Sequence, residues 1–328
     1  MSEVKLNLAL QGGGAHGAFT WGMLDRLLQE DDIRFDGISG TSAGAMNAVM
    51  LTAGWQQGGA AGARALLSEF WHRLMLPDSF DPAGWSRHWP TWWSGVTRHL
   101  SPYDLNPFDI NPLRDLLNDL VDFDRLRRDA PFQLFIAATE VETAKLKLFR
   151  EHELSTEHLL ASACLPALYQ AVEIEGAHYW DGGFAGNPVV YPLLFDCKAR
   201  DLLLLLLHPQ QPAAPPVSAQ AIADRVAELG FQTTFMREMR ALAAMHQRAR
   251  RSPWRLGRPE RRIRQMRLHV LGPDEGLSQL HRSSKLDVRP DFLLELMQRG
   301  QAQMDRWLQQ NRSALGRSSS CDIEAEFL

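Results

Sequence analysis

The sequence begins with two units that each join a short apolar strand to a helix through a glycine-rich turn. Val4–Leu10 is followed by the turn Gln11–Gly17 and by a helical pattern over Ala18–Gln29. Phe35–Ser39 is followed by the turn Gly40–Gly44 and a helix of small residues. Strands that alternate with helices in this way become parallel neighbours joined by crossover helices. The start of the chain therefore predicts an α/β fold.

Further strands and helices are expected along the rest of the chain. Six consecutive leucines over 202–207 are the composition of a central strand that is buried on both faces. The proline-rich stretch 210–216 then reads as a linker to a helical segment. The predicted strands are Phe132–Val141, Lys145–Arg150, Ala171–Ile174, Ala177–Trp180, Asp201–Leu207 and Met266–Leu271. The predicted helices are Ala45–Ala53, Ala61–Leu76, Thr156–Cys164, Ser218–Arg250 and Pro290–Asn311.

The composition excludes several classes of protein. With 45% hydrophobic and 23% charged residues the chain resembles an average globular protein, and its net charge of -4 gives no global sign of nucleic-acid binding. Three cysteines without a CxxC spacing argue against a disulfide framework and a zinc site. The first ten residues lack the features of a secretory signal, and the longest apolar run is far shorter than a membrane span. We therefore expect a cytoplasmic protein that binds no metal.

The second glycine turn carries a candidate nucleophile. Gly40, Ser42 and Gly44 form a G-x-S-x-G motif between a strand and a helix, which is the setting of a nucleophile elbow. The glycines permit a sharp turn that exposes the serine hydroxyl, and the helix directs its positive end at the reacting centre. The alternative is a plain tight turn without a catalytic role.

The first glycine turn fits a different class of protein. Gly12, Gly14 and Gly17 match the G-x-G-x-x-G fingerprint of dinucleotide-binding folds. That fingerprint also needs an acidic residue at the end of the second strand. Asp36 has about the right spacing but stands near the start of its predicted strand. A dinucleotide-binding protein therefore stays open as an alternative.

A serine hydroxyl needs a neighbouring base to become a nucleophile. Asp181 followed by His208 gives the chain order of an α/β-hydrolase triad. Ser42, however, follows only two predicted strands, which disfavours that plan, and His208 reads better as a polar residue at a strand end. Asp181 lies directly after a strand and before two glycines, so its carboxylate can sit exposed at a turn. An ordinary hairpin turn is the alternative.

Four segments occur along the chain in a characteristic order: Gly12–Gly17, Gly40–Gly44, Ala161–Pro166 and Asp181–Gly183. Together they resemble the signatures of the patatin-like phospholipase family. The resemblance implies a three-layer α/β/α catalytic domain over residues 1–210 with a mostly parallel sheet. A helical, arginine-rich extension over residues 211–328 would pack on this domain or extend it.

In this family a Ser–Asp dyad replaces the triad. The resemblance therefore implies that Ser42 is the nucleophile, that Asp181 is its general base, and that backbone N–H groups of Gly12, Gly13 and Gly14 form the oxyanion hole. Consecutive glycines at a helix start can present N–H groups in this way. The implied reaction is hydrolysis of carboxylic esters of lipids, as in a phospholipase A or a lysophospholipase, without a cofactor.

The first glycine turn departs from the family pattern on both sides. Many members carry Asp before the three glycines and Arg or Lys after them, whereas this chain has Gln11 and His16. His16 can carry a positive charge only in part near pH 7. We expect either a pH-sensitive cation beside the glycine loop or a helix-start residue without a catalytic role.

Two further segments could set substrate and location. A proline-rich insertion over 78–111 contains Trp85, Trp89, Trp92 and Trp93, which suit a membrane interface or a packed cover over the core. Eleven arginines lie from Arg237 to Arg267, opposed only by two glutamates. Such a segment attracts an anionic membrane surface, so we expect a lipid partner, possible binding at the inner membrane surface, and no nucleic acid.

Two other interpretations of the basic segment stay open. It could be a solvated face or an oligomer contact. A further alternative concerns the whole chain, which could be a non-catalytic scaffold that binds membranes or partners.

Overall fold

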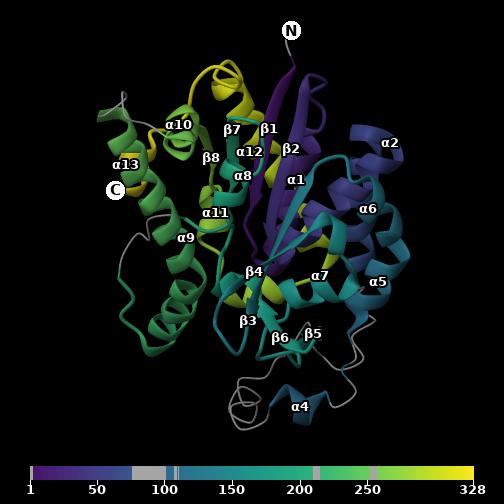
Figure 1. Cartoon of the computed structure of the whole chain (residues 1–328). Helices are drawn as coiled ribbons and strands as arrows, with labels where there is room; N and C mark the ends of the chain where they lie inside the picture. The colour runs from purple at the N-terminus through teal and green to yellow at the C-terminus, as the bar shows by residue number, and fades with distance from the viewer. Residues whose placement is uncertain (1–2, 76–100, 107–108, 110, 210–214, 252–256) are drawn as a thin grey trace.

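The computed structural model of the chain describes residues 3–75, 101–106, 109, 111–209, 215–251 and 257–328. Most of the predicted insertion over 78–111, with its four tryptophans, lies outside the described residues. Figure 1 shows a central sheet with helices on both of its sides. The mostly parallel α/β/α architecture expected from the sequence is therefore confirmed.

The sheet has the strand order β5-β6-β3-β2-β1-β7-β8, and β4 pairs with β3 outside this path. Neighbours from β3 to β8 along the order are parallel, whereas β4, β6 and β5 join in antiparallel fashion. The parallel strands bring their carboxyl ends to one edge, where ligands of α/β folds bind. The bounds are β1 Val4–Leu10, β2 Ile33–Thr41, β3 Gln133–Glu140, β4 Leu146–Arg150, β5 Val172–Ile174, β6 Ala177–Asp181, β7 Asp201–Leu205 and β8 Arg267–Leu271.

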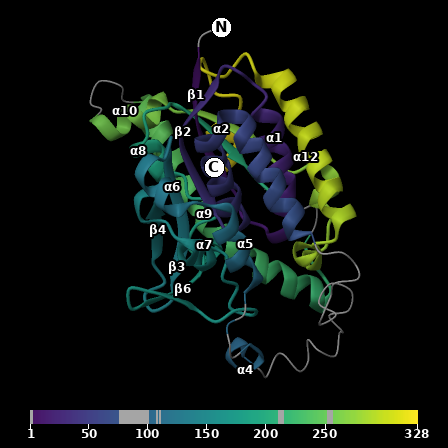
Figure 2. The same cartoon turned by 90° about the vertical axis from the view of Figure 1, so that its right-hand side faces the viewer.

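One side of the sheet is covered by helices from both ends of the chain, and Figure 2 shows α12 beside α1. Their bounds are α1 Gly17–Leu27, α2 Ala43–Leu74, α5 Pro112–Leu120, α6 Phe123–Asp129, α7 Thr156–Ser162 and α12 Pro290–Asn311. The other side is covered by α8 Tyr191–Phe195, α9 Ala219–Arg251, α10 Arg258–Gln265 and α13 Ile323–Phe327. Shorter elements are α4 Pro102–Leu105, α11 Glu275–Ser278, and the 3-10 helices η1 Gly14–His16, η2 Glu151–Glu153, η3 Gly182–Phe184 and η5 Arg282–Leu286.

The leucines of β7 pack into two hydrophobic cores, one on each face of the sheet. Leu203 and Leu205 pack into the core that includes α1, α2 and α12, whereas Leu202 and Leu204 pack into the core that includes α8 and α9. Successive side chains of a strand point to opposite faces, so an unbroken apolar run serves both. The prediction of a central strand buried on both faces is confirmed.

Several predicted helices also match the structure. The predicted helix over Pro290–Asn311 is α12, residue for residue. The two predicted helices over 45–53 and 61–76 are the halves of α2, which departs from helical geometry at Gly58 and Gly59. Within the described ranges, no helix has the length and the apolar character needed to cross a membrane.

Candidate active site

Ser42 lies at the carboxyl edge of the sheet, between the last residue of β2 and the first residue of α2. Its backbone has φ 55° and ψ -124°, in the left-handed half of φ space where a non-glycine residue is strained. A Cβ on Gly40 would lie 2.5 Å from the carbonyl oxygen of Gly44, so this turn closes only without a side chain there. The residues of the predicted elbow therefore form a sharp strand–turn–helix junction.

Asp181 is the last residue of β6 and lies against Ser42. Its carboxylate accepts a hydrogen bond from the backbone N–H of Gly183 at 2.7 Å. The expectation of an exposed carboxylate is wrong, because Asp181 is only 1% exposed. Burial raises the pKa of Asp181 to about 6, and the N–H of Gly183 and the nearby hydroxyl of Ser42 oppose that rise.

The carboxyl end of α7 holds both residues of this pair in place. The hydroxyl of Ser162 accepts a hydrogen bond from the backbone N–H of Ser42 at 3.0 Å. The carbonyl of Cys164 accepts one from the backbone N–H of Asp181 at 2.8 Å. The sequence marks the segment 161–166 only by resemblance and gives Ser162 no role, because its partner lies far away in the chain.

The glycine loop after β1 is fixed by two amide side chains. The Oδ1 atom of Asn187 accepts a hydrogen bond from the N–H of Gly12 at 2.6 Å. Gln11 donates to the carbonyl of Asn187 at 3.1 Å and accepts from two backbone N–H groups just after β7. Among the described residues, the N–H groups of Gly13 and Gly14 have no hydrogen-bond partner. Gln11 is thus a structural anchor. The loop offers two donors at Gly13 and Gly14, whereas the N–H of Gly12, which was also predicted as an oxyanion donor, is already bound to Asn187.

His16 is not a cation beside this loop. It is 3% exposed, and burial, assisted by the nearby charge of Lys285, lowers its pKa to about 4. Its Nε2 atom lies 2.8 Å from the hydroxyl of Ser284. The expectation of a partly charged histidine is therefore wrong, and His16 instead joins η1 to η5.

Lys285, from the same 3-10 helix η5, supplies a positive charge that sequence reasoning missed. Its Nζ atom lies 2.6 Å from Nε2 of His208. A Cβ on Gly14, which has φ +59°, would lie 2.3 Å from the carbonyl oxygen of Lys285, so the two backbones are in close contact. Burial lowers the pKa of Lys285 to about 8. Nothing in the local sequence marks this lysine, because only the fold brings it to the glycine loop.

These residues border a cavity of about 450 Å³ between the glycine loop, α9 and η5. Ser42, Asp181 and His208 belong to its lining. A volume of this size suits a small-molecule or acyl-chain site. Most of the remaining wall is apolar and comes from Leu165, Pro166, Leu168, Phe184, Phe231 and Leu286.

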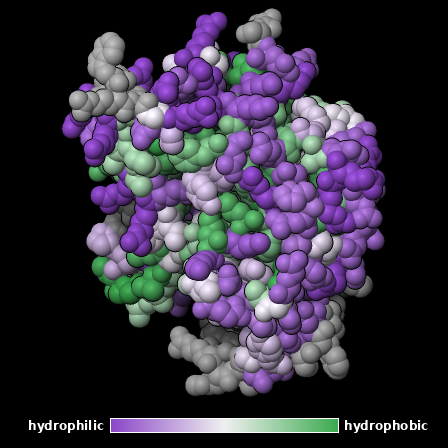
Figure 3. All heavy atoms as spheres, in the orientation of Figure 1, coloured by the Kyte–Doolittle hydropathy of each residue, from purple (hydrophilic) through white to green (hydrophobic). Residues whose placement is uncertain are grey.

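Helix α9 forms one wall of the cavity and presents two kinds of surface to the outside. Its first half carries exposed apolar side chains at Ile222, Val226 and Leu229, which share one helix face. Figure 3 shows the hydrophobic surface that belongs to this end of α9 at its lower left. The second half carries arginines, and those exposed in α9 and α10 are Arg237, Arg240, Arg248, Arg250, Arg251, Arg258, Arg261 and Arg264.

Two arginines of the basic segment are instead structural. Arg262 donates to the carbonyls of Leu194, Cys197, Lys198 and Ala199, which closes the end of α8. Arg267 pairs with the fully buried carboxylate of Asp201. The charge available for a partner is therefore smaller than the composition of the segment suggests.

Asp36, the acidic residue considered for a dinucleotide-binding site, is not in position to bind a ribose. Asp36 lies inside β2, and its carboxylate accepts hydrogen bonds from the backbone N–H groups of Lys198 and Ala199. It therefore caps a neighbouring turn and is not available to bind a ribose. In the described part of the chain, no group of three or more His, Cys, Asp or Glu side chains could hold a metal ion.

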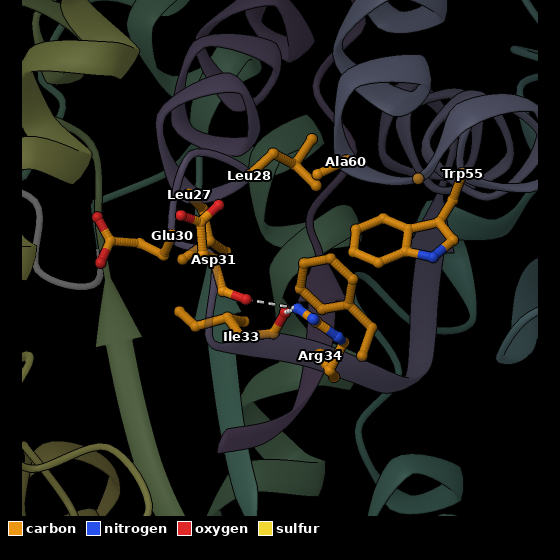
Figure 4. Close-up of a pocket in the computed structure, with 10 residues that line it drawn as sticks. Leu27, Leu28, Glu30, Asp31, Ile33, Arg34, Trp55 and Ala60 are labelled. Atoms are coloured by element: carbon orange, nitrogen blue, oxygen red, sulfur yellow. Dashed lines mark hydrogen bonds between the residues drawn. The ribbon is translucent and has the colours of Figure 1, made fainter. Parts of the chain in front are cut away.

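A second cavity, of about 250 Å³, lies at the opposite, amino end of β2 (Figure 4). Trp55 and Phe35 line it and meet edge to face with ring centroids 5.6 Å apart. Arg34 donates to the carbonyls of Asp31 and Ile33 and pairs with Glu3 at 3.0 Å. None of the predicted site residues borders this cavity.

The fold and the site define a class: an α/β protein with a serine, a buried aspartate and a glycine loop at the carboxyl edge of its sheet. The family model for patatin-like phospholipases matches residues 8–194, which is more than half of the chain. The chain belongs to the patatin-like phospholipase family, a family of lipid acyl hydrolases. A search of curated proteins finds no match.

Solved structures with a similar fold come from bacterial proteins. VipD from Legionella pneumophila is 16% identical, with a TM-score of 0.43 over 94% of this chain and 67% of that chain. The type III effector ExoU is 16% identical, with a TM-score of 0.39 over 94% of this chain and 53% of that chain. ExoU in complex with SpcU, from the type III secretion system of Pseudomonas aeruginosa, gives a TM-score of 0.33 at 16% identity, over 94% of this chain and 53% of that chain. The chain thus spans about half of ExoU.

Proposed function

We propose that this chain hydrolyses carboxylic ester bonds of lipids, as a phospholipase A or lysophospholipase, with Ser42 as nucleophile and Asp181 as general base. The observation that carries the proposal is the position of Ser42, on a strained turn, beside the buried carboxylate of Asp181 in the wall of one cavity. A base within hydrogen-bond reach is the geometric requirement for an activated serine. The apolar cavity beside this pair suits an acyl chain.

In this mechanism the Ser42 oxygen attacks the ester carbonyl while Asp181 takes the hydroxyl proton. The negative charge on the carbonyl oxygen is stabilised by the N–H groups of Gly13 and Gly14 and by the amino end of α2. Collapse of this intermediate breaks the ester bond, and the leaving alcohol takes the proton from Asp181. Water then gives a proton to Asp181 and attacks the acyl-enzyme. As the second intermediate collapses, the bond to Ser42 breaks, Asp181 returns the proton to the Ser42 oxygen, and the fatty acid is released. The steps need no cofactor.

The test is hydrolysis of p-nitrophenyl esters of graded chain length. We expect Ser42→Ala and Asp181→Asn each to lower kcat/KM by about 10³-fold or more, because each removes a group on which the other depends. Asp36→Asn is the matched control, because it changes the one acidic residue that a dinucleotide site would need. Equal rates in all four proteins would contradict the proposal, as would a loss confined to Asp36→Asn.

We propose further that α9 brings the enzyme to an anionic membrane surface, such as the cytoplasmic leaflet. Exposed arginines attract anionic headgroups, each contributing about 1 kcal/mol near the surface. The apolar face of Ile222, Val226 and Leu229 on the same helix could enter the headgroup region.

Sedimentation with vesicles tests this membrane proposal. We expect the triple variant Arg240→Gln, Arg248→Gln, Arg251→Gln to bind phosphatidylglycerol vesicles about 100-fold more weakly at low salt. The same three changes at the exposed residues Arg73, Arg128 and Arg317 are the control. Equal binding of both triple variants would contradict the role of α9. Vesicle binding by a protein that also fails the ester test would favour the scaffold alternative.

A further inference from the structure

The cavity beside Ser42 contains a lysine that no carboxylate neutralises. Among the described residues, Lys285 forms a hydrogen bond only with His208, and no Asp or Glu oxygen of these residues lies within 4 Å of its ammonium group. A partly buried ammonium without a counter-charge is unfavourable, as the lowered pKa of Lys285 also indicates. The site therefore favours an anion next to Lys285.

The acidic residues of the same cavity have other partners. The carboxylate of Asp224 lies 3.2 Å from Nε2 of His281. The carboxylate of Glu228 lies 3.2 Å from the guanidinium of Arg225 on the same helix. Glu228 is close enough to raise the pKa of Lys285 somewhat, but its direct ion pair is with Arg225. Neither carboxylate of the α9 wall is thus a direct partner of Lys285.

His208 holds the ammonium group of the lysine in place. A charged lysine can only donate, so Nε2 of His208 must be the acceptor of their hydrogen bond, and the ring proton must lie on Nδ1. That Nδ1 atom lies on the far side of the ring from Lys285 and is buried. His208 is 9% exposed, and burial keeps its pKa well below the ordinary value, so the ring is neutral. Lys285 therefore keeps two N–H donors that have no acceptor among the described residues.

The position of Lys285 relative to the glycine loop is fixed by contacts on both sides. Its carbonyl packs directly against Gly14, where no side chain would fit. Its neighbour Ser284 is bound to the buried ring of His16. The N–H groups of the loop and the ammonium group of Lys285 are therefore held together along the wall of a single cavity.

We propose that Lys285, oriented by His208, forms a subsite for a phosphate group, which holds the phosphodiester of a glycerophospholipid while its ester bond lies at Ser42. Lysine binds phosphate as a point charge. The subsite rests on the proposed ester hydrolysis and deepens it. It makes the enzyme select phospholipids over neutral acyl esters, and the cation expected at position 16 is supplied by residue 285.

The experiment compares a short-chain phosphatidylcholine with a p-nitrophenyl ester of the same acyl length. We expect Lys285→Gln to lower kcat/KM for the phospholipid about 10- to 100-fold more than for the neutral ester, mainly through KM. Lys285→Arg should restore most of the preference, because it keeps the charge. Lys198→Gln is the control, because this exposed lysine lies before the start of β7, at the other end of the strand from His208.

Inhibition by inorganic phosphate shows whether the ligand of Lys285 is the phosphate of a lipid headgroup or free phosphate. We expect phosphate to inhibit neutral-ester hydrolysis competitively in the wild type and much less in Lys285→Gln. An equal loss on both substrates in Lys285→Gln and Lys285→Arg would overturn the proposal, because Lys285 would then only support the loop. Inhibition by phosphate without any change in phospholipid preference would overturn the lipid assignment. A neutral-ester activity that survives Ser42→Ala would instead overturn the proposed function itself.

Discussion

The two ends of the same sheet each carry a cavity, and the two cavities differ in how their polar groups are satisfied. At the amino end, Arg34 pairs with Glu3, Glu30 pairs with Arg26 and Arg312, and the remaining charged residue of the lining, Asp31, is exposed. At the carboxyl end, Asp181 is buried without a cation, and Lys285 has no carboxylate in the described part of the chain. Both cavities have apolar walls, so a hollow lined by apolar residues does not by itself mark a functional site.

In this fold, the candidate site is marked by buried charges without partners and by strained backbone. Unpaired buried charges and strained backbone cost stability and persist only where the surrounding structure holds them. Ser42, with its positive φ, and the buried Asp181 are of this kind, and they lie in contact with each other. The amino-end cavity has no such feature, which is why we place the chemistry at the other end.

The pH dependence of ester hydrolysis tests most directly whether the buried Asp181 acts as the base. The base form of Asp181 is its carboxylate, and burial raises its pKa to about 6, so the active form is lost as the pH falls through that value. We expect kcat/KM for a p-nitrophenyl ester to fall about 100-fold from its plateau to pH 4, tenfold for each pH unit. Initial rates measured between pH 4 and pH 8 check this.

A substitution at Phe231 should move the acid limb, which is the fall of kcat/KM at low pH. The ring packs directly over Gly183, next to Asp181, where a Cβ would come within 2.1 Å of it. Phe231→Ala should admit water to the carboxylate, lower its pKa toward the ordinary value, and shift the acid limb to lower pH. An acid limb that lies near pH 4 in the wild type, or that does not move in this variant, would argue against Asp181 as the base.

The parts of the site that the sequence predicts are those encoded by neighbouring residues. The elbow at Ser42 follows from a strand, two glycines and a helix within a dozen positions, and the structure has that geometry. The leucine run identifies a central strand, because a strand that is buried on both faces does not alternate apolar and polar side chains as a half-exposed strand does. The pairing of Ser42 with Asp181 was available only through resemblance, since nothing local connects two residues on different strands.

The parts that the sequence misses depend on contacts across the chain. Lys285 reaches the glycine loop only because η5 packs against η1, and His16 is neutral only because that packing buries it. The burial of Asp181 likewise comes from β3, α7 and α9, which no pattern around residue 181 reveals. Burial and long-range charge are tertiary properties, and they shift the pKa values of Asp181, His16, His208 and Lys285.

The smallest effect on activity is expected at the amino-end cavity. Trp55 meets Phe35 and Phe132 edge to face, with centroids 5.6 and 6.0 Å apart, so its ring packs the end of the sheet. Trp55→Ala should lower the free energy of unfolding by about 2–3 kcal/mol, measured by urea denaturation, because it removes a partly buried ring and two aromatic contacts. Its kcat/KM for a p-nitrophenyl ester should stay close to that of the wild type, because no group of the carboxyl-end site touches this cavity. A large loss of rate in a protein that remains folded would show that the two ends are coupled, and the contrast between them would then no longer separate chemistry from packing.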